Sequence, residues 1–285
     1  MDLGLLAVLV AALWGAATGA LLPRAAYRFS APSGEAWRER CPQGHPVRGW
    51  LGRARCGQCA GEETPFGSRE AGEVVDGSRE AGEVVDGSRE ASEVVDGSRE
   101  AGEPSYGPRA ASLALVTALV CAVLAAATGT RPELAVWLLL APVGVLLAAV
   151  DLKVRRLPDP LTLPLAGAAV ALLGLTALVP EHAGEWTTAL LGALALGAGY
   201  LVLFLINPAG MGFGDVKLAL TAGAVLGWYG WPTLMLGTFA GFLLGAFYGG
   251  ALLVARRAGR KTAIPFGPFL IAGAFLGVLA GAYAA

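Results

Sequence analysis

The sequence predicts an all-α polytopic membrane protein with about eight transmembrane helices and a cytoplasmic loop domain that contains cysteines. Of its 285 residues, 55% are hydrophobic and 15% are charged, and the mean hydropathy is +0.59. Several apolar stretches approach the ~20 residues that a helix needs to cross ~30 Å of hydrocarbon. A helix satisfies its own backbone polar groups in lipid, so repeated stretches of this kind favour a helical bundle.

The apolar stretches divide the chain into eight expected spans. The first lacks a basic residue at its amino end and is long for a signal core, so we expect a retained span rather than a cleaved signal peptide. The sixth is the shortest. The spans are Leu3–Leu22, Ala110–Gly129, Leu134–Val150, Leu161–Val179, Trp186–Ile206, Val216–Trp228, Thr233–Ala255 and Phe266–Tyr283.

Basic residues predict the orientation of these spans. The loops after spans one, three, five and seven hold twelve, three, one and four Lys or Arg, twenty of the chain's 21. The remaining one, Arg131, lies on the opposite side. Because cytoplasmic loops carry an excess of Lys and Arg, we expect both chain ends on the outer side of the plasma membrane. No feature indicates a nucleic-acid partner.

Residues 24–66, after a first transmembrane segment at 1–23, form the expected cytoplasmic Cys-containing region. Cys56 and Cys59 have the spacing typical of a zinc site. Cys41 could supply a third ligand and His45 the fourth, and a cytoplasmic location argues against a disulfide. The alternative is a set of free thiols left from an incomplete site.

A decapeptide array follows from Gly67 to Glu103. Gly-Ser-Arg-Glu-Ala-Gly-Glu-Val-Val-Asp begins at residues 67, 77 and 87, with Ser92 in place of one glycine and a partial copy at 97. Each full copy has one basic and three acidic residues and only two strongly apolar ones. Such a segment cannot bury a core. We therefore expect a disordered linker at 67–109, rather than a binding array, before a seven-helix domain at 110–285.

Two aspartates stand at the ends of expected membrane helices. Asp151 follows the span that ends at Val150, and Asp215 lies in the glycine-containing stretch before the sixth span. An ionisable residue at a membrane edge is costly, so each is a candidate functional group. Both fall at cytoplasmic ends. Gly212, Gly214, Lys217 and Asp159 are expected to support them, with Asp159 also a possible N-cap of the next helix.

A pair of carboxyl groups suits an aspartic protease. One carboxylate activates water as a general base, and one carboxylic acid polarises the scissile carbonyl; two close carboxyls readily share a single proton. Neither histidine stands near a nucleophile with a carboxylate partner. A proton- or ion-coupled transporter and a catalytically inactive assembly scaffold remain as alternatives. Transporters place charged groups near the midplane, often across inverted repeats, and no such repeat is evident.

The residues around the aspartates carry a family resemblance. Gly212-Phe-Gly-Asp215 matches the Gly-x-Gly-Asp motif of intramembrane aspartyl proteases. Together with Asp151, Leu157–Pro164, Gly210–Lys217 and Pro265–Pro268, it resembles the type IV prepilin peptidases, also called prepilin leader peptidase/N-methyltransferases. The resemblance covers most of the chain except the array.

The resemblance implies that Asp151 and Asp215 are a catalytic pair that needs no cofactor for cleavage. It implies substrates that are type IV prepilins or pseudopilins, whose leader is removed just before a hydrophobic helix. It also implies N-methylation of the new amino terminus from S-adenosylmethionine, through a region that residues 24–66 resemble. The family usually has two Cys-x-x-Cys pairs there and this chain has one, so zinc binding and methylation stay open.

Overall fold

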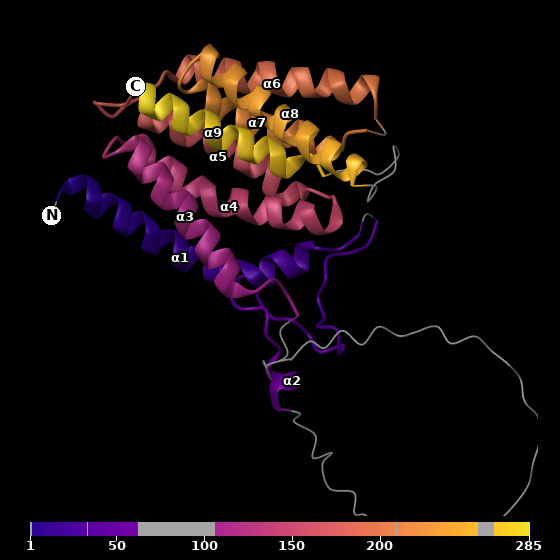
Figure 1. The fold of residues 1–285 in the computed structure, drawn as a ribbon. Coiled ribbons are helices and arrows are strands. Elements are labelled where there is room, and N and C mark those ends of the chain that lie inside the picture. The colour runs from indigo at the N-terminus through magenta and orange to yellow at the C-terminus, as the bar shows by residue number, and fades with distance from the viewer. Residues whose placement is uncertain (1, 33, 62–105, 209, 256–264) are drawn as a thin grey trace, which may run out of the picture.

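The computed structural model describes residues 2–32, 34–61, 106–208, 210–255 and 265–285. Within them the fold is all-helical, and the only strand-like feature is an isolated bridge between Arg40 and Pro46. The array lies outside the described residues, as does the basic stretch at 256–261. The helices in Figure 1 are α1 (Leu3–Phe29), α2 (Gly57–Gly61), α3 (Ala110–Thr128), α4 (Glu133–Val154), α5 (Asp159–Thr176), α6 (Trp186–Ile206), α7 (Phe213–Gly227), α8 (Trp231–Val254) and α9 (Gly267–Ala284).

Seven of these described helices are long and apolar enough to cross a membrane, namely α1, α3, α4, α5, α6, α8 and α9. The chain is thus a multi-pass membrane protein. The expected sixth span corresponds to α7, which has only 15 residues. Helix α7 packs against α5, α6, α8 and α9, and residues such as Ala219, Ala224 and Leu226 are fully buried. Helix α7 is therefore a short internal helix packed among longer ones.

Among the helix boundaries that differ from expectation, three matter for the site. Helix α1 continues to Phe29, beyond the expected end at Leu22. Helix α4 continues to Val154, so Asp151 lies in its last turn. Helix α7 begins at Phe213, so Asp215 lies in its first turn rather than in the preceding loop. These helices extend past the apolar runs because residues beyond each run pack against neighbouring segments, and Ala26, Asp151 and Asp215 are buried there.

The Cys-containing region is hydrogen bonded to the carboxyl-terminal part of α1. Pro23 has no N–H to donate and disturbs the helical hydrogen bonds around it. Gly52 compensates: its N–H donates to the Leu21 carbonyl at 2.7 Å, and its carbonyl accepts the Arg24 N–H at 3.0 Å. The Arg24 guanidinium also donates to the carbonyls of Arg48 and other residues of the same loop. The region is therefore attached directly to a membrane helix.

Helices α1 and α3 lie side by side although the array separates them in sequence (Figure 1). A Cβ at Gly19 would lie 2.6 Å from the Leu113 carbonyl oxygen, and one at Gly15 would lie 2.5 Å from the Thr117 carbonyl oxygen. The small-xxx-small spacing thus permits a backbone contact that any side chain would prevent.

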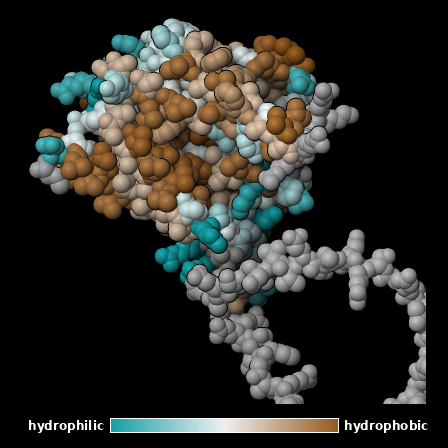
Figure 2. All heavy atoms as spheres, in the orientation of Figure 1, coloured by the Kyte–Doolittle hydropathy of each residue, from teal (hydrophilic) through white to brown (hydrophobic). Residues whose placement is uncertain are grey.

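Both chain ends lie at one end of the bundle in Figure 1, and α2 with the Cys-containing region lies at the other. The α4–α5 and α6–α7 connections, which flank the two aspartates, lie at the same end as α2. Figure 2 shows that the side of the bundle bearing α3, α4 and α9 is predominantly hydrophobic, as a surface facing lipid must be.

Candidate active site and candidate metal centre

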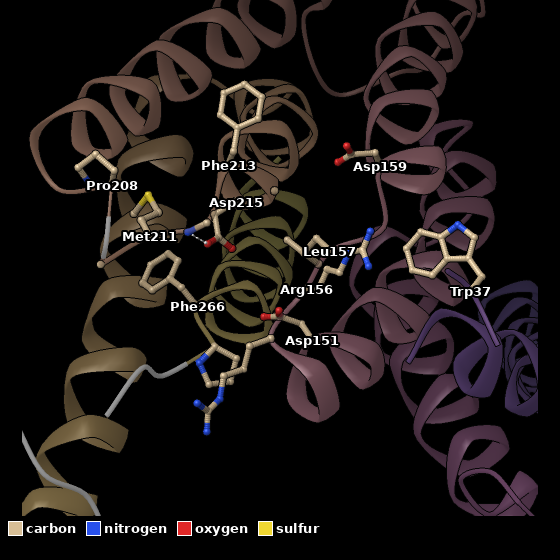
Figure 3. Close-up of a pocket in the computed structure, with 15 residues that line it drawn as sticks. Trp37, Asp151, Arg156, Leu157, Asp159, Pro208, Met211, Phe213, Asp215 and Phe266 are labelled. Atoms are coloured by element: carbon tan, nitrogen blue, oxygen red, sulfur yellow. Dashed lines mark hydrogen bonds between the residues drawn. The ribbon is translucent and has the colours of Figure 1, made fainter. Parts of the chain in front are cut away.

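Asp151 and Asp215 are brought together in one cavity of about 440 Å³. Asp151 comes from the end of α4 and Asp215 from the start of α7, and only 4% and 7% of these residues are exposed. Figure 3 shows the two carboxyl groups pointing toward the same space, with Phe266 beside them. The cavity has the size of a typical ligand site. The two aspartates that the sequence predicts as a pair therefore line the same cavity at one end of the bundle.

Asp151 is held by the first residue of α9. The backbone N–H of Gly267 donates to Asp151 Oδ2 at 3.1 Å. A Cβ at Gly267 would lie 2.7 Å from that oxygen, closer than a carbon and an oxygen can approach. Glycine therefore permits this close approach of backbone to carboxylate, and a side chain here would displace the carboxylate.

Asp215 is held by its own helix. It is the third residue of α7, and its Oδ2 accepts the backbone N–H of Gly212, the N-cap, at 3.2 Å. This is the carboxylate half of a capping box, and the helix dipole favours a negative charge there. Gly214 allows close packing, because a Cβ there would lie 2.8 Å from Leu157 Cβ. Both glycines thus lie beside the aspartate as predicted, with different roles.

Asp159 and Lys217 pair with each other. Lys217 Nζ lies 2.7 Å from Asp159 Oδ1, and the Asp159 side chain is 65% exposed. Lys217 also lies 5.0 Å from the centre of the Phe213 ring. Asp159 is the first residue of α5, and Pro158 takes the N-cap position that the sequence suggested for it. The pair joins the first turns of α5 and α7 at the cavity rim, and Asp159 is set apart from the other two carboxyls in Figure 3.

Several residues that contact the aspartates or line the cavity were not identified from the sequence. Gly267 belongs to a recognisable Pro-Phe-Gly-Pro block, but nothing in that block reveals a contact with Asp151. Arg156 and Trp37 come from distant segments: the Arg156 guanidinium donates to the Pro32 carbonyl at 3.1 Å and lies 4.4 Å from the centre of the Trp37 ring. The segment after α1 therefore forms part of the cavity wall, which the long separation in sequence concealed.

Cys41, His45, Cys56 and Cys59 form a second cluster, next to the end of α1. Their ligand atoms all lie within 4.8 Å of one another. A turn brings His45 back to Cys41, whose N–H donates to the His45 carbonyl at 2.8 Å, and α2 carries Cys59. Backbone hydrogen bonding from Cys59 lowers the pKa of Cys56 to about 6, while burial raises the pKa of Cys59 to about 12.

The spacing within this cluster suits a tetrahedral zinc ion. The Cys41 and Cys59 sulfurs are 3.7 Å apart, and His45 Nδ1 lies 3.7 Å from Cys41 Sγ and 3.2 Å from Cys59 Sγ. Zinc–sulfur bonds of ~2.3 Å at tetrahedral angles would place two sulfurs about 3.8 Å apart. Three thiolates and one imidazole are also a usual structural zinc set. The four predicted residues therefore fit the ion.

Comparison with known proteins finds similarity in the part of the chain that forms the helical bundle. Residues 135–250 match the type IV leader peptidase family, and this stretch contains both Asp151 and Asp215. A prepilin leader peptidase/N-methyltransferase of Aeromonas hydrophila is 37% identical over 178 residues, 59% of this chain and 56% of that protein. One of Pseudomonas aeruginosa is 33% identical over 186 residues, 61% of this chain and 59% of that protein. The chain spans little more than half the length of these curated relatives, and no solved structure matches it.

Proposed function

We propose that this chain, whose residues 135–250 match the type IV leader peptidase family, is a membrane aspartic endopeptidase. Its substrates are type IV prepilins or pseudopilins, and it removes their leader peptides at the cytoplasmic face of the bacterial plasma membrane. Asp151 and Asp215 are the catalytic pair. The observation that carries the proposal is their convergence, from two helices, in one cavity large enough for a peptide segment.

The pair works as an acid and a base. Each carboxyl group is buried and accepts one backbone N–H, from Gly267 or Gly212, which fixes its orientation. Two neighbouring buried carboxyls cannot both ionise easily, so they carry one proton between them. The ionised one removes a proton from water, which attacks the scissile carbonyl. The protonated one donates a hydrogen bond to the carbonyl oxygen, and a proton then passes to the leaving nitrogen.

Charge supports a cytoplasmic location for this site. The cavity and the Cys-containing region lie at the same end of the bundle (Figure 1), and the loops expected at that end hold twenty of the 21 Lys and Arg. By the positive-inside rule that end is cytoplasmic, and both chain ends are outside. A transporter would instead place its charged site near the membrane midplane.

The Cys-containing region supports a second activity. The relatives are named prepilin leader peptidase/N-methyltransferase, and the described part of residues 24–61 provides a folded unit with a candidate zinc site. Cys41, His45, Cys56 and Cys59 would hold zinc as a structural ion that joins the turn at residues 41–45 to α2. S-adenosylmethionine, when bound, would supply the methyl group for the amino terminus that cleavage exposes.

Matched aspartate variants test the peptidase. Asp151→Asn and Asp215→Asn should each lower the cleavage rate of a pilin precursor by about 10²- to 10⁴-fold, because each variant lacks the general acid or the general base. Asp159→Asn is the control, since this residue lies at the same cavity rim but pairs with Lys217. Cleavage is measured on full-length protein reconstituted in vesicles. Wild-type rates in either of the first two variants would remove that residue from the mechanism, and a wild-type protein that cleaves no precursor would refute the function.

A further inference from the structure

A second feature of the bundle is an apolar groove between α3, α4, α7 and α9. We propose that this groove is the docking site for the hydrophobic helix of the substrate, the segment that follows the scissile bond. The proposal rests on the peptidase function proposed above and adds to it a binding surface separate from the catalytic cavity.

The groove has a volume of about 470 Å³ and runs along the membrane-spanning part of the bundle. Its lining extends along α4 from Trp137 to Leu152, which at ~1.5 Å per residue corresponds to about 22 Å. Among the residues that line it, Thr221 and Trp137 alone carry a polar side-chain atom. It opens on the hydrophobic side formed by α3, α4 and α9, which Figure 2 displays. Its length therefore suits an apolar helix of roughly four turns.

One end of the groove adjoins the catalytic cavity. Leu152 and Pro268 line the groove and directly follow Asp151 and Gly267, which are hydrogen bonded to each other. Leu218 also lines it and lies about one turn after the other catalytic aspartate on α7. Leu218 also packs in one cluster with Leu157, which lines the cavity, so packed side chains connect the lining of the groove to that of the cavity. A helix in the groove would therefore end next to the carboxyl pair.

Thr221 indicates the kind of molecule that enters. Its hydroxyl is buried in the groove wall and has no hydrogen-bond partner. The buried hydroxyls of Thr117 and Thr176 instead donate to carbonyls four residues earlier in their own helices, at 2.7 and 2.9 Å. An unsatisfied polar group costs several kcal/mol in hydrocarbon, so the Thr221 hydroxyl favours an occupant that offers an acceptor.

That requirement distinguishes a polypeptide from a lipid. An acyl chain would fill the groove but has no acceptor at this depth. A helical peptide presents carbonyl oxygens and polar side chains that can accept from a threonine hydroxyl. With its helix in the groove, a substrate would place the peptide bond just before that helix in the cavity with Asp151 and Asp215. The position of the docked helix would therefore determine which peptide bond of the substrate is cleaved.

Two glycines offer a matched test. Gly144 lines the groove and Gly167 lines a second apolar depression between α5 and α6, and both leave room for a Cβ. Gly144→Leu should raise KM for a pilin precursor about tenfold with little change in kcat, because it fills the groove. Gly167→Leu should change neither. Thr221→Val should also raise KM, while Thr176→Val, which removes a hydroxyl satisfied within its own helix, should not.

Photocrosslinking gives an independent readout. A photoreactive amino acid at Ala148, in the groove, should crosslink to the hydrophobic segment of the precursor, whereas one at Ala171, in the second depression, should not. Equal KM values for the two leucine variants, or crosslinks to phospholipid alone from position 148, would overturn the docking site while leaving the peptidase intact. A wild-type protein that cleaves no precursor would instead refute the proposed function itself.

Discussion

Replacing Gly267 by alanine tests how closely the catalytic pair depends on its backbone contacts. The added Cβ would lie 2.7 Å from Asp151 Oδ2, so the carboxylate must move by several tenths of an ångström. The movement weakens the 3.1 Å hydrogen bond from the Gly267 N–H. A hydrogen bond to a charged group contributes about 1.5–3 kcal/mol, which corresponds to about 10- to 150-fold in rate. We expect a loss of kcat/KM within that range.

Gly212→Ala is the matched control for this variant. Gly212 also donates its N–H to a catalytic carboxylate, at 3.2 Å, but a Cβ there would lie 3.5 Å from Asp215 Oδ2, an ordinary contact. Its φ of −78° is open to alanine. This variant should keep activity within about threefold of the wild type.

The assay is cleavage of a pilin precursor in vesicles, with thermal unfolding measured for both glycine variants. Overpacking at Gly267 should cost about 1–3 kcal/mol of stability at most, so both proteins should remain folded at the assay temperature. Full activity of Gly267→Ala would refute the idea that this close contact positions Asp151. Equal losses in the two variants would show a general sensitivity to alanine at helix starts instead.

Three further outcomes are expected. Asp159→Asn and Lys217→Met should each leave kcat within about threefold and lower stability by about 1 kcal/mol or less, because the Asp159 side chain of the ion pair is 65% exposed to solvent; a thermal shift assay with cleavage kinetics measures both. Cys56→Ser with Cys59→Ser should abolish zinc binding in metal analysis, spare cleavage, and reduce N-methylation of mature pilin by mass spectrometry; loss of cleavage would contradict the separation of the two activities. Deleting residues 67–96 should leave cleavage near the wild-type rate, since a shorter linker changes loop-closure entropy little; loss of membrane insertion would contradict this.

The fold was largely predictable because hydropathy reports directly on membrane spans. Seven of the eight expected spans correspond to helices long and apolar enough to cross a membrane, and the Trp186–Ile206 span has the predicted ends. Helix α7 was harder to delimit. Its first turn carries Asp215 and Lys217, which interrupt the apolar run, and only tertiary packing shows that a short helix is fully enclosed by others.

The candidate site was predictable where residue chemistry is unusual and not where it depends on geometry. Asp151 and Asp215 stood out because carboxylates are costly at membrane edges, and Cys41, His45, Cys56 and Cys59 stood out by ligand type. The contact between Gly267 and Asp151 could not be read from the sequence, since a glycine before a proline fits an ordinary helix start. The pairing of Asp159 with Lys217 likewise requires two helix starts to meet in space.

Because α1 and α3 are in close contact, the two helices need not depend on an unbroken chain between them to stay together. Tyr106 donates its N–H to the Ala54 carbonyl at 3.0 Å, so the chain re-enters the described structure beside the region that it left. The glycine-mediated contact of the two helices then attaches the amino-terminal unit directly to the bundle. We therefore expect two co-expressed fragments, divided within residues 67–96, to reassemble by association of these helices.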